Sequence, residues 1–238
     1  MKKLILSLLL ALGCLTTEAV ELKSEGRDAA YVEAIVKRSQ KIVDKLELAD
    51  EAARQAVLHI IANRYFELND IYEARDARKA EFKAWNLPAE YQQLADDFVR
   101  YECDSKLYRS HFAFPATLGI YLSPEQVTAV IDGMTYGVVK VTYDSHLDMI
   151  PTLTEEEKKQ IEAWLVEARE FAVDAENSNK KHGAFGKYKG RINNYLSKRG
   201  YDLKAEREAW YKRIEERKAK EESGKSKEAR AKRKDKRD

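Results

Sequence analysis

Apolar residues recur at intervals of three and four positions along almost the whole chain, and this spacing is the strongest constraint on its fold. It appears first at Val32, Ile35 and Val36, and again at Val57 and Ile61. A helix with 3.6 residues per turn gathers such positions on one face. The pattern predicts an all-α fold, a single-domain bundle of about six or seven helices.

Two helix starts carry complete capping chemistry. Ser123 precedes a proline and has Gln126 three residues later, and Thr154 has Glu157 at the same distance. A Ser or Thr side chain can accept from the backbone of the third helical residue, whose own side chain accepts in return. These pairs predict helices that begin at residues 124 and 155. Upstream, Pro88 favours the first turn of a helix that carries Leu94, Phe98 and Tyr101 at helical spacing.

The stretch VVKVTYDSHLDMIP between these two starts is rich in β-branched residues, and we expect an extended or irregular segment that crosses the bundle. Asp144, His146 and Asp148 alternate, so they would point to one side of an extended chain. Together with His182 they are weak candidates for a metal site or for acid-base chemistry. We favour a structural hydrogen bond between the histidine and a carboxylate, and we expect no cofactor.

The segment GAFGKYKGRINNYLSKRG, residues 183–200, combines glycines, cations and aromatic rings. Its glycine spacing fits neither the dinucleotide fingerprint nor the Walker loop. We expect Gly183 and Gly186 to form a loop that leads into a short helix ended by Gly200. Tyr195, Ile192 and Leu196 are assigned to the core.

The remaining polar and aromatic residues of this segment are candidates for a ligand surface. Ring faces next to amides and cations suit sugars, and the cations suit acidic sugars. The predicted partner is therefore an oligosaccharide or polysaccharide, acidic ones included. The candidate ligand-binding residues are Phe185, Lys187, Tyr188, Arg191, Asn193, Asn194 and Tyr143.

The first 19 residues have the features of a secretion signal. Lys2 and Lys3 precede an apolar run too short to span a bilayer, and Ala19 suits a cleavage site. We expect export to the periplasm or the cell surface, as a soluble protein in preference to one anchored through Cys14. Cleavage would leave a single cysteine, Cys103, which we expect to be a buried thiol.

Basic and acidic residues are unevenly distributed along the rest of the chain. From Lys204 onward there are 15 basic and 9 acidic residues. We assign residues 24–203 to a helical domain, 204–220 to a C-terminal helix and 221–238 to a basic disordered tail. In an exported protein these charges do not indicate a nucleic-acid partner.

The sequence motifs LDMIP, LTEEE and GKYKGRINNYL resemble those of a secreted bacterial family catalogued as domain of unknown function 3826. The resemblance is strongest from Gly133 to Leu203 and implies a sugar-binding role near carbohydrate-utilisation genes of polysaccharide-degrading bacteria. It supports a carbohydrate-binding accessory protein, and because the sequence contains no catalytic motif that we recognise, we favour a binding role over an enzymatic one. One alternative is a hydrolase or lyase that uses Asp144, His146 and Asp148. The other is a structural or partner-binding envelope protein.

Overall fold

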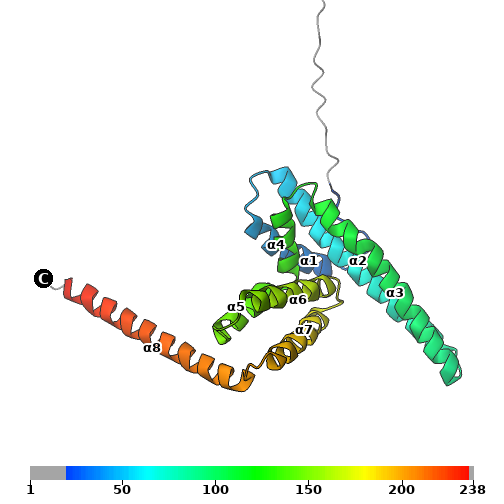
Figure 1. Ribbon diagram of the computed structural model, residues 1–238. Helices are drawn as coiled ribbons and strands as arrows, with labels where there is room; N and C mark the ends of the chain where they lie inside the picture. Colours follow the sequence, from blue (N-terminus) through cyan, green and yellow to red (C-terminus); the bar gives the residue numbers. More distant parts are fainter. Residues whose placement is uncertain (1–19, 236–238) are drawn as a thin grey trace, which may run out of the picture. The chain divides into compact units, whose positions relative to one another are not determined.

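The computed structural model describes residues 20–235, with side chains as far as residue 222 (Figure 1). Between these limits the chain is helical and has no strand, so the predicted all-α class is confirmed. The predicted signal peptide, Cys14 and residues 236–238 lie outside this range. No helix within it has the length and apolar character needed to cross a bilayer. The elements are α1 (Ala29–Val43), the 3₁₀ turn η1 (Asp44–Leu46), α2 (Glu51–Ala84), α3 (Ala89–Leu118), α4 (Pro124–Met134), α5 (Val138–Met149), α6 (Glu155–Val173), α7 (Ser178–Lys198) and α8 (Leu203–Asp235).

The predicted count of six or seven helices is too low for the described residues, which form eight α-helices. The difference is α5, since the expected extended segment is helical from Val138 to Met149. Val138, Thr142 and His146 are buried at intervals of four residues along one face of α5. Packing of that face outweighs the weak helix propensity of β-branched residues. Gly137, at φ 65°, makes the turn that separates α5 from α4.

The expected loop at Gly183 and Gly186 is also wrong, because α7 runs through both glycines. Asn177 caps this helix by accepting from the Lys180 backbone at 3.0 Å. The helix ends as predicted, with Gly200 in the left-handed conformation at φ 98°.

The chain consists of two compact units, and the described part of the first is residues 20–63. Here the segment before α1 is tied to α2. The Lys23 amide donates to Asn63 Oδ1 at 2.8 Å, and Asn63 Nδ2 donates to the Glu21 carbonyl at 2.8 Å. His59 Nδ1 lies 2.6 Å from the Val20 carbonyl. The residues that follow the predicted cleavage site are therefore part of the folded unit.

The second unit, described for residues 64–235, contains a hydrophobic core formed by α5, α6 and α7. The side chains of this core come from facing turns of the three helices and from the connection between α5 and α6. They are Val138, Met149, Ile150, Leu153, Ile161, Leu165, Ala168, Ala172, Phe185, Ile192 and Leu196.

A polar cluster in the second unit joins the remainder of α2 and α3 to the end of α6. Asp174 accepts from Arg64 Nη2 at 2.6 Å, and its second oxygen lies 2.7 Å from His111 Nδ1. Lys181 Nζ donates to the carbonyls of Met134 at 3.2 Å and Val173 at 3.0 Å, at the ends of α4 and α6. A buried cation at two helix C-termini is favourable because both present negative partial charge.

Both predicted capping boxes are present, at Ser123 with Gln126 and at Thr154 with Glu157. Glu157 has a second role, because its buried carboxylate accepts from Arg199 Nε at 2.9 Å and from the Tyr201 hydroxyl at 2.7 Å. These bonds join the start of α6 to the end of α7. Burial alone would raise the pKa of Glu157, but the hydrogen bonds outweigh it and lower the pKa to about 2.

The last helix, α8, is fixed to the end of α5 through Asp148. Trp210 Nε1 donates to Asp148 Oδ2 at 2.7 Å, and Arg217 forms two bonds to the same carboxylate. Hydrogen bonds from Arg217 and Trp210 lower the pKa of Asp148 to about 2. Beyond Glu221, where we expected a disordered tail, α8 continues to Asp235. Its many Ala, Glu, Lys and Arg residues are good helix formers.

Candidate functional site

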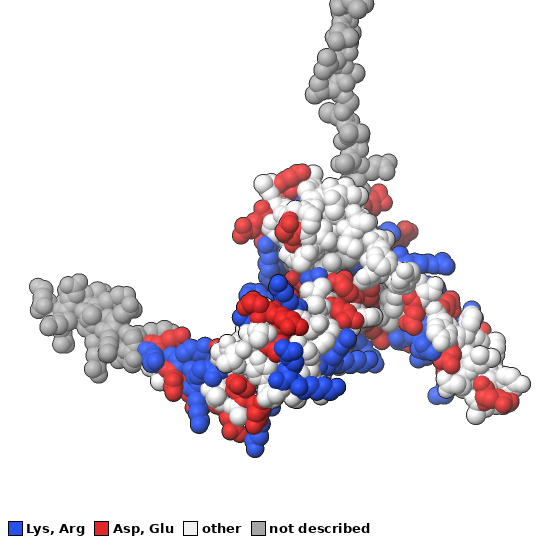
Figure 2. Space-filling view, viewed as in Figure 1, with Lys and Arg blue, Asp and Glu red and all other residues white. Residues whose placement is uncertain are grey.

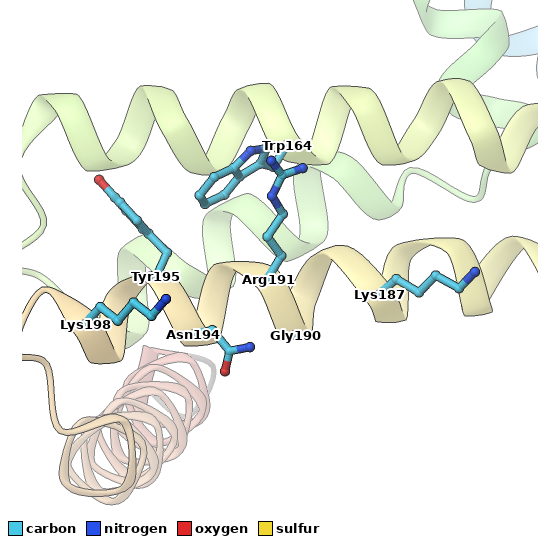
Figure 3. Close-up of a pocket in the computed structure, with 7 residues that line it drawn as sticks. All are labelled: Trp164, Lys187, Gly190, Arg191, Asn194, Tyr195 and Lys198. Carbon is cyan, nitrogen blue, oxygen red and sulfur yellow. The ribbon is translucent and has the colours of Figure 1, made fainter.

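An open groove lies between α6 and α7, with a volume of about 630 Å³ (Figure 3). Its α7 wall uses positions separated by three and four residues, so these side chains share one face of the helix. The opposite face of α7 packs into the core through Ile192 and Leu196. The groove is lined by Trp164 from α6 and by Lys187, Gly190, Arg191, Asn194, Tyr195 and Lys198 from α7.

Arg191 occupies the middle of this groove and reaches across to α6 (Figure 3). Its guanidinium carbon lies 4.7 Å from the centre of the Trp164 ring. Tyr195 meets the same indole edge to face, with ring centres 5.1 Å apart. Stacking on the indole restricts the guanidinium while its N–H groups remain able to donate.

The groove carries more positive than negative charge. Lys187 and Lys198 lie on either side of Arg191 along α7, and neither has an ion-pair partner among the residues whose side chains are described. The nearest carboxylate partner is Glu167, whose Oε2 lies 3.4 Å from Arg191 Nη1 in an exposed pair. Exposed pairs of this kind are weak and can be exchanged for another anion. Figure 2 shows Lys and Arg side chains gathered over α7.

The groove contains three of the predicted ligand-binding residues, Lys187, Arg191 and Asn194. Phe185 is a correction: only 1% of its surface is exposed, and it belongs to the core of α5, α6 and α7. Its ring has no face left for a ligand. The period of α7 explains the error, since Phe185 lies seven residues before Ile192 and shares its face.

The other predicted residues lie outside the groove lining. Tyr188 is half-buried and stacks against Phe171, with ring centres 6.4 Å apart. Burial raises the pKa of the Tyr188 hydroxyl, and a hydrogen bond to Glu167 raises it further. Asn193 and Tyr143 are half-buried, and Tyr143 packs against the core.

The candidate metal ligands are not brought together. Because α5 is helical, His146 turns inward while Asp144 faces solvent and pairs with Lys140 at 2.7 Å. Asp148 is bonded to α8, and His182 stacks on Tyr136 with ring centres 5.5 Å apart. No group of three or more potential metal ligands occurs among the described residues.

His146 makes a structural hydrogen bond, though not to a carboxylate as expected. Its Nδ1 donates to the carbonyl of Thr142, one turn earlier in α5, at 2.7 Å. Burial lowers the pKa of His146, which favours the neutral imidazole. Within the described structure the acid-base group predicted for an enzyme is therefore not assembled.

A family model described as a protein of unknown function, DUF3826, matches residues 32–216. The chain belongs to the DUF3826 family. No curated protein matches the chain. Every residue that lines the groove of this DUF3826 protein lies within residues 32–216, the range that the family model matches.

Four groove residues of this DUF3826 protein were missing from the sequence prediction: Trp164, Gly190, Tyr195 and Lys198. Helical spacing assigns Tyr195 to the core, but Tyr195 is only half-buried, and so is Trp164. A weak signal was present, because tryptophan and tyrosine are rarely buried completely. Nothing in the sequence pairs Trp164 with Arg191, since they come from different helices.

Proposed function

We propose that this protein is a carbohydrate-binding accessory protein of polysaccharide utilisation, and that the groove between α6 and α7 binds an acidic oligosaccharide. The observation that carries the proposal is the Arg191 guanidinium, stacked on Trp164 between two lysines in an open groove. A planar guanidinium matches the two oxygens of a sugar carboxylate. The sugar-binding role and secretion implied by the family resemblance support the same ligand class.

The other groove residues suit the remainder of a sugar chain. Tyr195 and the indole edge of Trp164 provide apolar surface for a pyranose ring. The Asn194 amide can donate to and accept from hydroxyl groups. Gly190 has no side chain, so the backbone of α7 is accessible at the centre of the groove.

Calorimetric titration with uronic-acid oligosaccharides, and with neutral oligosaccharides of the same length, tests this proposal. We expect the acidic series to bind more tightly. Arg191→Ala should weaken its binding by about 10- to 100-fold, since hydrogen bonds to charged groups contribute about 1.5–3 kcal/mol. Trp164→Ala should also weaken binding, because it removes the ring that orients Arg191.

Lys189→Ala is the matched control, because Lys189 is an exposed cation of α7 that does not line the groove. It should bind like the wild type. Equal losses in Lys189→Ala and Arg191→Ala would indicate a nonspecific charge effect and exclude the groove. Wild-type binding by both Arg191→Ala and Trp164→Ala would also exclude it.

A further inference from the structure

The outward face of α3 carries large apolar side chains that leave more than half of their surface exposed. Six of them have exposed fractions between 54% and 68%. Single exposed apolar residues are common, but a continuous row of this kind indicates an interaction surface. This row, here called the α3 stripe, consists of Tyr91, Leu94, Phe98, Tyr101, Tyr108 and Phe112.

The positions of the α3 stripe alternate by three and four residues, with the exposed Ser105 at the one interrupted place. This is the spacing of a coiled-coil seam, which meets a partner helix along its whole length. The opposite side of α3 is already occupied, since Ala95, Val99 and Cys103 are buried, as predicted for the cysteine. The helix therefore has one packed apolar face and one that is unpartnered.

The size of the α3 stripe suits a protein interface. If a large side chain presents about 200 Å² in total, these exposed fractions amount to roughly 700 Å². That exceeds the largest apolar patch of a typical monomer, about 300–600 Å². It approaches the area of about 800 Å² that each partner contributes to a standard stable interface.

Charge along α3 indicates which partner fits. Residues 89–104 contain five acidic residues and one basic residue, whereas residues 105–118 contain two basic residues and no acidic one. Glu90 near one end and Arg109 toward the other have no ion-pair partner among the residues whose side chains are described. The acidic half disfavours an anionic membrane or polysaccharide. A second α3 in the antiparallel direction would bring acidic and basic halves together.

We propose that two copies of this protein associate through the α3 stripe, with the two α3 helices antiparallel and related by a twofold axis. Such an interface is self-complementary, because each copy presents the same surface and receives the same surface. The arm formed by residues 64–84 of α2 together with α3 bears the stripe (Figure 1), and uncharged surface lies between the charged side chains of this arm (Figure 2). This inference is independent of the groove and its ligand.

Sedimentation of the purified protein over a range of concentrations tests the association. We expect a dimer for the wild type. The double variant Leu94→Asp, Phe98→Asp should weaken dimerisation at least about 100-fold, because central apolar anchors dominate interface energy and buried unpaired charge is costly. Its circular dichroism should stay unchanged, since both side chains are exposed.

Val141→Asp is the matched control, an equally exposed apolar residue on α5, with 64% of its surface accessible. This variant should dimerise like the wild type. A wild type that remains monomeric at all concentrations would overturn the proposal. A dimer that survives the double variant would overturn it as well. If the wild type is a monomer that is retained on polysaccharide, and the double variant loses that retention, the stripe binds polysaccharide and the proposal is also overturned.

The antiparallel direction has its own test. Arg109→Glu makes the basic end acidic and should weaken the dimer several-fold, and adding Glu90→Lys should restore it. In a parallel pair like ends lie together, so the second change would not restore association. A dimer that responds to neither variant would exclude the antiparallel arrangement.

Discussion

The α6–α7 pair and α3 carry the same three-four spacing of apolar residues and use it in opposite ways. On α7 the row that includes Phe185 and Ile192 is enclosed by α5 and α6. On α3 the row that includes Leu94 and Phe98 is exposed to solvent. The period shows that one face of a helix is apolar, whereas the elements that arrive from elsewhere decide whether that face becomes core or interface.

The largest predicted change in stability distinguishes the buried apolar face of α7 from the exposed apolar face of α3. Phe185→Ala should lower the free energy of unfolding by about 3–5 kcal/mol, because it leaves a cavity in a close-packed core. Phe98→Ala should lower the stability of the monomer by no more than about 1 kcal/mol, since more than half of its surface is exposed. Chemical denaturation at low protein concentration measures both. Equal losses would mean that the α3 stripe is covered within the monomer.

A smaller effect is expected at Glu157, which fixes the relative position of the two groove helices. Its pKa is lowered from about 4.5 to about 2 in the fold, so its stabilisation is complete above the ordinary pKa and is lost as the pH falls toward 2. Glu157→Gln should cost about 1–3 kcal/mol at pH 7, because Arg199 and Tyr201 lose the charge of the buried carboxylate that they bond. Its loss of stability between pH 4.5 and 2 should be smaller than that of the wild type.

Denaturation curves at pH 7 and at acidic pH distinguish the two roles of this residue. Glutamine can still accept from the Thr154 amide, as Gln126 does for Ser123 in α4. The variant therefore keeps the cap and removes the charge that Arg199 and Tyr201 bond. Wild-type stability at pH 7 would show that this charge does not stabilise the fold.

Local chemistry explains which parts of this fold could be predicted from the sequence. The starts of α4 and α6 were predicted because a capping box involves only neighbouring residues. The helical state of α5 was missed because it depends on the burial of Val138 and His146, which the segment itself does not encode. Contacts between distant segments are not visible in a single sequence.

The same limit applies to the candidate site. Lys187, Arg191 and Asn194 were identified because one helix presents them together. Trp164 was missed because the second wall of the groove comes from α6, an earlier part of the chain. Phe185 was assigned to the ligand surface because we expected a loop at Gly183. In the structure this stretch is part of α7, and its helical spacing places Phe185 on the core-facing side.

The smallest predicted change in stability concerns two glycines of α7 that have similar surroundings. Apart from the adjoining backbone of α7, a Cβ atom at Gly183 or at Gly190 would meet no atom within 4 Å. Because alanine is the better helix former, each Gly→Ala change should raise the free energy of unfolding by about 0.5–1 kcal/mol. Only Gly190 lines the groove, so Gly190→Ala should also weaken oligosaccharide binding while Gly183→Ala should not. Thermal unfolding and calorimetric titration of both variants measure the two effects separately. If Gly190→Ala gains stability and binds like the wild type, the ligand does not approach the backbone of α7 at this turn.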